Sequence, residues 1–297
     1  MDSGHSVDSV DSVDGIAGEI TVVRTRAELR LALGGAPRPV GLVPTMGWLH
    51  AGHRALVERA RADNATTVVS IFVNPRQFGD PSDLQQYPRN ESRDVAICAE
   101  EGADLVFAPS VDEVYPPGFD TVVQVGAVAR PLEGAARPGH FDGVATVVAV
   151  LFNLVGAERA YFGQKDAQQL RVIRQMARDL ALPIEVIGLP TVREPDGLAM
   201  SSRNRYLDVI QRQQAAAISE ALFMAERRLR TGEQDLRAVA AEMRQTIESA
   251  GLSTDYATIR DPRTLNELTE PESRMVLLIA ARLGGVRLID NLEVTLV

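Results

Sequence analysis

The sequence is poor in cysteine and histidine, and each shortage narrows the kinds of site that it can build. Cys98 is the one cysteine, which excludes an internal disulfide and argues against a metal site made from thiolates. Histidine occurs four times and no H-E-x-x-H motif is present, so a zinc centre is a weak interpretation. This composition fits a reducing compartment, and we expect a cytoplasmic protein.

Long apolar runs and a leader-like N-terminus are also missing. No apolar stretch approaches the roughly 18–20 residues of a membrane-spanning helix, so no membrane is expected as a partner. The first residues, MDSGHSVDSVDSVDG, have neither the basic nor the apolar region of a signal peptide. Apolar residues still make up 45% of the chain, which predicts a globular fold with a proper core.

Basic residues are missing near the N-terminus and are outnumbered by acidic residues in the chain as a whole. The formal net charge is −9, and residues 1–20 contain five acidic residues and no lysine or arginine. Because nucleic-acid binding needs a basic surface, no nucleic acid is expected as a partner. The repeated VDSVDSVD has too few large apolar groups to offset the entropy of ordering, so residues 1–18 are predicted to form a disordered acidic tail. A partner that binds this tail is an alternative.

Lysine is as rare as cysteine, because Lys165 is the one lysine among 31 basic residues. Arginine therefore serves almost wherever a surface cation suffices. A lone lysine can mark a place that needs a compact and flexible ammonium group. Chance under a strong codon bias explains it equally well, and composition alone leaves both interpretations open.

Strand-like and helix-like segments alternate along the first two thirds of the chain. The strand-like segments are 19–24, 39–45, 66–73, 104–109, 159–163 and 183–189, and the helix-like segments are 26–35, 52–63, 91–103, 143–156 and 164–180. This alternation predicts an α/β fold with a parallel sheet. We expect a Rossmann-like domain over residues 19–190.

The pattern changes after residue 190. Two helices are predicted at about 209–230 and 235–250, followed by strands at 254–260, 273–283 and 286–294. Helices followed by strands indicate a separate, smaller α+β domain, which we place at 191–297. We expect it to act as a lid that moves about a hinge at 191–197.

Four polar clusters follow strands of the predicted parallel sheet. Ligands of open α/β sheets bind beyond the carboxyl ends of the strands, and all four clusters belong at that edge. They are PTMGWLHAGH (44–53), NPRQFG (74–79), GQKDAQQ (163–169) and AMSSRN (199–204).

His50 and His53 lie three residues apart at the start of a predicted helix. Exposed N–H groups and the positive end of the helix dipole make such a place an anion site, and Gly47 and Gly52 let a phosphate approach the backbone. Two imidazoles at this spacing can donate to one oxyanion. The alternative is a capped pair of histidines with a structural role.

Two further clusters suit phosphate oxygens. Lys165 and Asp166 follow Gly163 at a strand-to-helix turn, where a lysine commonly contacts phosphate; Asp166 is also a natural N-cap. Ser201, Ser202 and Arg203 supply two hydroxyl groups and a guanidinium, although a plain polar loop has the same composition.

Neutral amides make up the remaining polar side chains of the clusters. They can recognise the hydroxyl or carboxylate groups of a small substrate without adding charge, while surface polarity is the ordinary role of any one of them. They are Asn74, Gln77, Gln168 and Gln169. Together the clusters predict a cleft that holds a polyphosphate and a small polar acid and stabilises charge on phosphorus.

Five motifs in this order carry a family resemblance. PTMGWLHAGH, IFVNPRQFG, RPGHFDGVATVV, YFGQKDAQQL and PTVREPDGLAMSSRNRYL together resemble the pantothenate synthetase, or pantoate–β-alanine ligase, family. H-x-G-H alone occurs in many nucleotidylyltransferases, whereas the set of five is highly specific. The resemblance runs from about residue 20 to the C-terminus.

The resemblance implies a reaction and its small-molecule partners. Members condense (R)-pantoate with β-alanine in an ATP-dependent reaction through a pantoyl adenylate, releasing AMP and pyrophosphate. Mg²⁺ accompanies the ATP, and members are commonly homodimers. The apolar segment TTVVSIFV (66–73) is one that could lie near a subunit edge.

The resemblance also assigns residues. His53 would be the proton donor, His50, Lys165, Ser201, Ser202 and Arg203 would act on the phosphates, and Asp94 is a weak match for a residue assisting Mg²⁺. Pantoate would contact Gln77 and Gln169, with Asn74 and Arg137 at the same end. The ATP site would comprise Met46, Gly47, His50, Gly52, His53, Gly163, Gln164, Lys165, Asp166, Val192, Met200, Ser201, Ser202 and Arg203.

Four positions depart from the family pattern. Ala51 and Gln164 replace glutamates, Ala167 replaces an aromatic residue and would leave space in the pocket wall, and Arg76 replaces a smaller or apolar residue. These departures put efficiency in doubt more than identity. Two alternatives remain at this point: another H-x-G-H nucleotidylyltransferase with a phosphorylated acceptor, or a regulator that binds nucleotide without turnover.

Overall fold

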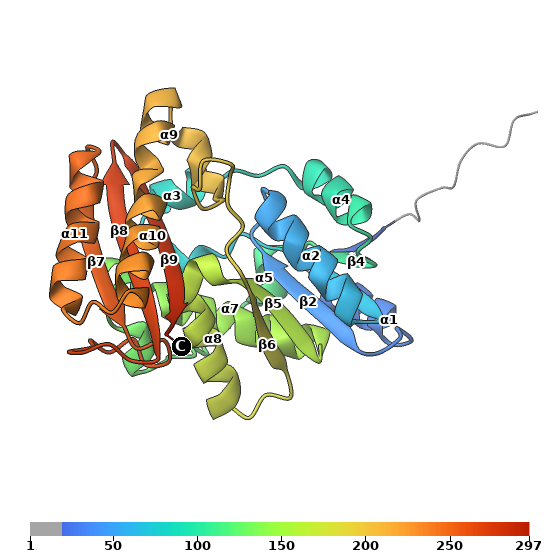
Figure 1. The fold of residues 1–297 in the computed structure, drawn as a ribbon. Coiled ribbons are helices and arrows are strands. Elements are labelled where there is room, and N and C mark those ends of the chain that lie inside the picture. Colours follow the sequence, from blue (N-terminus) through green and yellow to red (C-terminus); the bar gives the residue numbers. More distant parts are fainter. Residues whose placement is uncertain (1–19, 297) are drawn as a thin grey trace, which may run out of the picture.

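The computed structural model describes residues 20–296 and contains two β-sheets (Figure 1). The predicted acidic tail at 1–18 lies outside the described residues. The two sheets fall on either side of residue 190, as the sequence pattern indicates. The exact domain boundary at 190 and 191 stays a prediction. None of the described helices has the length and apolar character that a membrane span requires.

The first sheet has six parallel strands in the order β1-β4-β3-β2-β5-β6. Along the chain these are β1 (Thr21–Val23), β2 (Val40–Thr45), β3 (Thr66–Ile71), β4 (Leu105–Phe107), β5 (Arg159–Gly163) and β6 (Glu185–Leu189). All six predicted strands are therefore confirmed. β3 is wrong as a candidate subunit edge, because it pairs with β2 and β4 on its two sides and its side chains are almost all buried.

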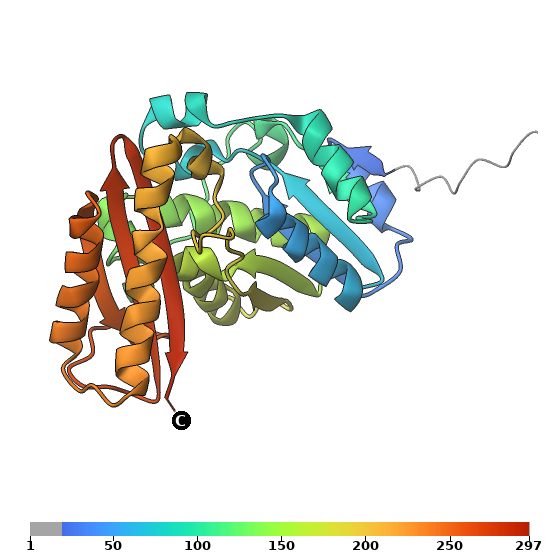
Figure 2. The same ribbon diagram turned by 45° about the horizontal axis from the view of Figure 1, so that its top comes forward.

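Helices cover both faces of this sheet (Figures 1 and 2). Successive strand residues point to opposite faces, so Leu42 packs with one set of helices and Val43 with the other. The first set comprises α1 (Arg26–Leu33), α7 (His140–Val155) and α8 (Ala167–Asp179), and the second comprises α2 (Ala51–Asp63) and α4 (Glu91–Glu100). Nearly every residue of α7 is buried, which explains its apolar sequence.

The second sheet is antiparallel, in the order β7-β8-β9. Its strands are β7 (Ser253–Arg260), β8 (Arg274–Leu283) and β9 (Val286–Thr295), and its helices are α9 (Val209–Ala215), α10 (Ala217–Arg230) and α11 (Leu236–Ser249). They share a separate core. The single helix predicted over 209–230 is wrong in one respect, because it divides at Ala216, whose carbonyl accepts from the Ser219 hydroxyl.

Short helices in the loops escaped the sequence patterns because three to six residues show no periodicity. They are η1 (Pro75–Gln77), α3 (Pro81–Gln86), α5 (Val111–Val114), η2 (Ala127–Ala129), α6 (Glu133–Ala136), η3 (Gln164–Asp166) and η4 (Ser202–Tyr206). Four of them, η1, α6, η3 and η4, carry or adjoin predicted site residues.

Candidate active site

A cavity of about 240 Å³ lies beyond the carboxyl ends of β2, β3, β5 and β6. All four polar clusters predicted at this edge contribute to its lining. The structure therefore brings together these predicted site residues: Met46, His50, Gly52, His53, Asn74, Gln77, Arg137, Gly163, Lys165, Asp166, Gln169, Val192, Met200, Ser201, Ser202 and Arg203. Gly47 and Gln164 do not line it.

Gly47 instead shapes the turn that follows β2. Its φ is +81°, and Trp48 also has a positive φ of 53°. A Cβ on Gly47 would lie 2.9 Å from the Asp94 carboxylate, so glycine is required here by both conformation and space. Asp94 is buried and accepts the backbone N–H groups of Trp48 (2.7 Å) and Leu49 (2.8 Å). Asp94 thus organises this turn and does not line the cavity, and its suggested role beside Mg²⁺ stays a prediction.

Helix α2 begins with a capping box made from two imidazoles. His50 Nδ1 accepts from the Gly52 N–H (3.1 Å), and His53 Nδ1 accepts from the His50 N–H (3.3 Å). An accepting Nδ1 places the proton of each neutral ring on Nε2. Burial, aided by Lys165, lowers the pKa of His50 to about 4; burial, aided by His50, lowers that of His53 to about 3. Both rings are therefore neutral Nε2–H donors at neutral pH.

The capping hydrogen bonds change which groups are left to donate to an anion. The Gly52 N–H is taken by His50, so it is not free for phosphate as the sequence suggested. The imidazoles, whose ring centroids lie 4.2 Å apart, replace the backbone as donors. Gly52 is still needed, because a Cβ there would lie 2.9 Å from the His50 ring. The interpretation of a capped, hydrogen-bonded pair is therefore confirmed, and the role of the pair toward phosphate stays a prediction.

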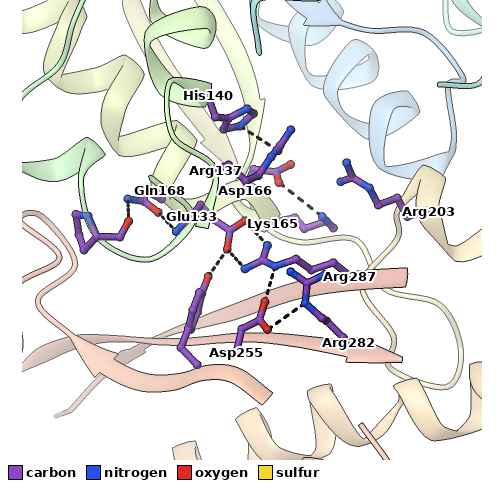
Figure 3. A network of polar contacts seen from close by, with 12 residues as sticks. Glu133, Arg137, His140, Lys165, Asp166, Gln168, Arg203, Asp255, Arg282 and Arg287 are labelled. Atoms are coloured by element: carbon purple, nitrogen blue, oxygen red, sulfur yellow. Dashed lines mark hydrogen bonds and ion pairs between the residues drawn. The ribbon is translucent and has the colours of Figure 1, made fainter. Parts of the chain in front are cut away.

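Lys165 and Asp166 lie in η3, just before α8. Lys165 Nζ is 3.6 Å from Asp166 Oδ1 (Figure 3). Asp166 occupies the N-cap position of α8 but makes no capping hydrogen bond, so the predicted capping role is wrong. Burial alone would raise the pKa of Asp166, but the positive charges of Lys165 and Arg203 hold it below its usual value. The loop thus presents an ion pair to the cavity.

The serine loop, which carries Ser201 and Ser202, lines the same cavity as Lys165. Met200 N donates to Val192 O (2.9 Å), and the Ser201 hydroxyl accepts from Arg203 N (3.2 Å). The Arg203 guanidinium lies 3.7 Å from Asp83 of α3 and is about 40% exposed. Two hydroxyl groups and two cations therefore line the same cavity as the imidazoles.

Gln77 is held by a chain of hydrogen bonds that begins at backbone groups. Asn74 Oδ1 accepts from the Arg76 N–H (3.2 Å), so Asn74 Nδ2 must face the Gly143 carbonyl (3.1 Å) and Gln77 Oε1 (3.0 Å). The Tyr115 hydroxyl also donates to Asn74 Oδ1 (2.8 Å). Asn74 therefore has no capacity left for a substrate, and it positions Gln77 instead.

The Gln77 side chain is consequently a donor toward the cavity. Its oxygen is taken by Asn74, and its Nε2 donates to Met46 Sδ (3.1 Å), a weak acceptor that a substrate oxygen can replace. For the Gln169 side chain, which also lines the cavity, we find no hydrogen bond to residues 20–296. Two neutral amides thus face the same space.

His140 belongs to the site although the sequence patterns did not single it out. Its Nδ1–H donates to the Gln77 carbonyl (2.9 Å), which leaves Nε2 to accept from Arg137 (3.3 Å). Burial, aided by Arg137, lowers the pKa of His140 to about 4. The signal was present in the RPGHFDG motif, where Arg137 and His140 lie three residues apart.

A second cavity of about 700 Å³ adjoins the first and shares Lys165, Asp166 and Arg203 with it. It lies between the two sheets, where Arg287 of β9 makes a bidentate ion pair with the buried Glu133 of α6 (Figure 3). Gln168 lines this second cavity, but its amide is hydrogen-bonded within the protein, so its predicted contact with substrate has no support here. It is buried and holds the backbone of Glu133, Val128 and Pro131.

The four departures from the family pattern occupy different places. Ala51 is exposed, and the Gln164 carbonyl is hydrogen-bonded to β9. Ala167 is 3% exposed, so packing fills much of the space that a small residue was expected to leave. The Arg76 guanidinium lies 4.9 Å from the centre of the Tyr115 ring and stacks on it, which supports the chain that holds Gln77.

No resident metal centre is built by the described residues. Within 20–296, no group of three or more His, Cys, Asp or Glu side chains is placed to hold an ion. Asp166 is the one acidic side chain that lines the smaller cavity, and it is paired with Lys165. The donor set therefore suits phosphate rather than a protein-bound cation.

Comparison with known proteins identifies the family. A family model described as pantoate–β-alanine ligase matches residues 21–293. The chain belongs to the pantoate–β-alanine ligase family. Pantothenate synthetase from Roseiflexus castenholzii is 54% identical over 271 residues, covering 91% of this chain and 98% of the relative. That from Aquifex aeolicus is 49% identical, covering 86% and 92%.

Solved structures of the same family share the fold. Pantothenate synthetase from Thermus thermophilus superimposes with a TM-score of 0.90 at 50% identity, covering 93% of this chain and all of that one. Pantoate–β-alanine ligase from Francisella tularensis, solved in complex with β,γ-ATP and β-alanine, gives 0.78 at 34% identity and covers 92% and 97%. These relatives carry the names of ligases, and the chain is a ligase of this family.

Proposed function

We propose that this ligase condenses (R)-pantoate with β-alanine through a pantoyl adenylate, and that the cavity at the edge of the parallel sheet is the site of both steps. One observation carries the proposal. Two neutral imidazole donors, one ammonium group, two hydroxyls and two amide side chains line a single cavity of about 240 Å³. The Francisella tularensis relative, solved with a form of ATP and β-alanine, supports the same ligands here.

The first step makes the carboxylate reactive without a nucleophile from the protein. An oxygen of the pantoate carboxylate attacks the α-phosphorus of ATP, and the bond from that phosphorus to the departing pyrophosphate breaks. Lys165 and the Nε2–H groups of His50 and His53 donate to the oxygens on which negative charge grows. Stabilisation of this kind and in-line positioning are the main requirements of phosphoryl transfer.

The second step transfers the acyl group to the amine. The neutral amine nitrogen of β-alanine attacks the acyl carbon, an amide bond forms, the bond to the AMP oxygen breaks, and the nitrogen loses one proton to solvent. In our proposal Gln77 and Gln169 hold the pantoyl oxygens during both steps, while the loops around Gly163 and Met200 hold the nucleotide. Arg137 lies at the substrate end, where it contacts the Gln77 carbonyl.

Mg²⁺ enters this proposal as part of the substrate. The described residues fit a metal that arrives with the triphosphate better than one held by the protein, because Asp166 is the one carboxylate at the smaller cavity. Mg²⁺ commonly keeps several waters and binds through substrate phosphates. Bound there, it would neutralise charge on the phosphates.

The proposal is tested by isotope exchange between pyrophosphate and ATP. The purified chain is expected to catalyse exchange when pantoate is present and to show none without it. A folded protein without pantoate-dependent exchange would refute the proposal. Turnover with a phosphate ester in place of pantoate would favour another nucleotidylyltransferase, and tight ATP binding without exchange would favour a regulator.

Three further expectations accompany the proposed function. A homodimer is expected and can be measured by sedimentation. Residues 191–297 are proposed to close over the ATP site, although in the present conformation the hinge segment is a hydrogen-bonded hairpin in which Arg193 pairs with Ala199. A cytoplasmic location is expected and can be tested by fractionation.

A further inference from the structure

Two adjacent residues of β9 reach from the second sheet to two loops of the proposed site. Asp290 and Asn291 are 4% and 3% exposed. β9 is the strand of its sheet that lies nearest the parallel sheet (Figures 1 and 2). Neither residue was singled out by the sequence motifs, and both line the larger cavity but not the smaller one.

Asn291 binds the backbone of the loop that carries Lys165. Its side-chain Nδ2 donates to the carbonyl oxygens of Gln164 (2.9 Å) and Lys165 (2.7 Å). Both partners are backbone acceptors, so the amide nitrogen must face them, and the orientation of the side chain is fixed. The position of η3 therefore depends on β9. The backbone of Lys165, the one lysine in the chain, belongs to η3 and depends on β9 as well.

Asp290 holds the other loop through Arg193. The Arg193 guanidinium donates to both carboxylate oxygens, at 2.6 and 3.1 Å, and also to the Gly197 carbonyl at 3.0 Å. Arg193 is bridged to Ala199, and the neighbouring pair Val192 and Met200 lines the cavity. The same ion pair thus fixes the hairpin that leads into Ser201 and Ser202.

The two contacts are also joined to each other. The Asn291 N–H donates to Asp290 Oδ1 (2.7 Å), and Arg193 reaches the Asn291 carbonyl (3.4 Å). Because both groups are buried, these bonds are little weakened by water. A single dipeptide therefore sets the separation between the lysine loop and the serine loop.

We propose that Asp290 and Asn291 are positioning residues for adenylation, which act by holding Lys165 and the serine loop at the separation that one triphosphate requires. This inference rests on the proposed function. It assigns to the second sheet a role in the chemical step even though its side chains touch no reacting atom. A misplacement of about 1 Å at a reacting centre can cost 10²-fold in rate, so small shifts of these loops matter.

The main test compares two variants of Asn291 in pantoate-dependent pyrophosphate exchange. Asn291→Leu removes both hydrogen bonds, and Asn291→Asp turns the donor into an acceptor that faces two carbonyls. We expect kcat to fall about tenfold in the first variant and further in the second. The KM for pantoate should stay within about twofold, because neither residue contacts the Gln77 loop; a general loss of structure would change both.

A double variant shows whether Asn291 acts through Lys165. If it does, Lys165→Ala combined with Asn291→Leu should be no slower than Lys165→Ala alone, because the group being positioned is already absent. A loss of exchange rate in the double variant that equals the product of the losses in the two single variants would overturn the proposal. So would a folded Asn291→Asp protein whose exchange rate lies within about twofold of the wild type.

A control from the same strand separates positioning from general stability. Glu293, two residues further along β9, accepts from the buried Arg171 of α8 at 2.6 Å and contacts neither loop. Glu293→Gln is expected to lower the thermal midpoint while exchange stays within about twofold. Equal loss of kcat in Glu293→Gln and Asn291→Leu would refute a specific role.

The failure of this inference can be told from failure of the proposed function. If the wild-type chain shows no pantoate-dependent exchange, the proposed function fails before any variant is compared. If the wild type exchanges and the Asn291 variants do so equally well, the proposed function stands and the positioning role falls.

Discussion

The two sheets contribute to the site in different ways, and the difference follows from strand direction. In the parallel sheet every strand ends at the same edge, so the loops after β2, β3, β5 and β6 converge on one cavity. In the antiparallel sheet successive ends alternate, and no edge collects them. Its contribution comes from within β9, where Arg287, Asp290 and Asn291 hold parts of the first sheet's loops.

This comparison teaches that contact with ligand and control of geometry can be divided between two sheets. The parallel sheet supplies the donors, and the antiparallel sheet fixes the loops that carry them. Substitutions in the first should therefore change rate constants and substrate binding directly. Substitutions in the second should matter only where they hold a loop.

The largest effect is expected at Lys165. Lys165→Ala removes the one ammonium group at the cavity, and exchange should fall by at least about 10²-fold, which is typical for loss of one electrostatic stabiliser. The measurement is pantoate-dependent pyrophosphate exchange, with the thermal midpoint as a check on folding. A near-normal rate would mean that Lys165, the main contribution of the parallel sheet, does not act in the mechanism.

A smaller effect is expected at Gln77. Gln77→Glu keeps the shape of the side chain but turns the donor toward the cavity into a negative acceptor, opposite the carboxylate of pantoate. The KM for pantoate should rise about tenfold or more, because hydrogen bonds to charged groups contribute about 1.5–3 kcal/mol. The KM for ATP serves as the internal control and should stay within about twofold. An unchanged KM for pantoate would mean that the pantoate carboxylate does not bind beside Gln77.

The pH dependence of stability distinguishes the two regions next. His50, His53 and His140 all lie in the parallel-sheet part of the described chain, with pKa values lowered to about 4, 3 and 4, mainly by burial. Unfolded histidines bind protons below about pH 6.5, whereas these stay neutral when folded, so the unfolded state takes up more protons. Stability should be greatest above pH 6.5 and fall as the pH drops toward 4.

Each of these histidines should contribute about 1.4 kcal/mol per pH unit within that interval. Urea unfolding at pH 7, 6 and 5 measures the slope, and NMR of the imidazole protons identifies the groups. Rings that titrate near pH 6.5 in the folded protein would contradict the neutral-donor assignment of His50 and His53.

The smallest effect is expected on the second sheet, away from the loops. Arg282 is 55% exposed and lies 3.2 Å from Asp255, which Arg287 also contacts. Exposed ion pairs contribute about 0–1 kcal/mol, so Arg282→Gln should change the free energy of unfolding by less than about 1 kcal/mol. Exchange should stay within about twofold. A large loss of activity would mean that the antiparallel sheet acts on the site through more than Asp290 and Asn291.

Much of the fold could be predicted because its signals are local. The six parallel strands and the long helices follow from apolar periodicity, and the edge at which His50, Lys165 and Ser201 meet follows from the rule for parallel strands. The family resemblance gave the expected ligands. Short helices such as η3 and α6, and the break at Ala216, carry no periodic signal.

The roles of several site residues could not be predicted, because they depend on partners far away in the chain. Asp94 organises the turn at Gly47, 47 residues before it in the sequence, and the motifs gave no sign of this role. Asn74 and Gln168 were expected to face substrate, and both use their amides on the protein. A polar residue shows its type in the sequence, but burial decides which atoms remain free.

The sequence by itself determined the strand order along the chain, the four polar clusters and the family, because each of these depends on neighbours within about a dozen residues or on motif identity. Only the tertiary structure decided the neutral Nε2–H state of the imidazoles, the direction of the Gln77 amide and the hold of Asn291 on the Lys165 loop. Burial decides the charge of the imidazoles. Hydrogen bonds between distant segments orient Asn74, which sets the Gln77 amide, and join Asn291 to the Lys165 loop. These conditions exist only once the chain has folded.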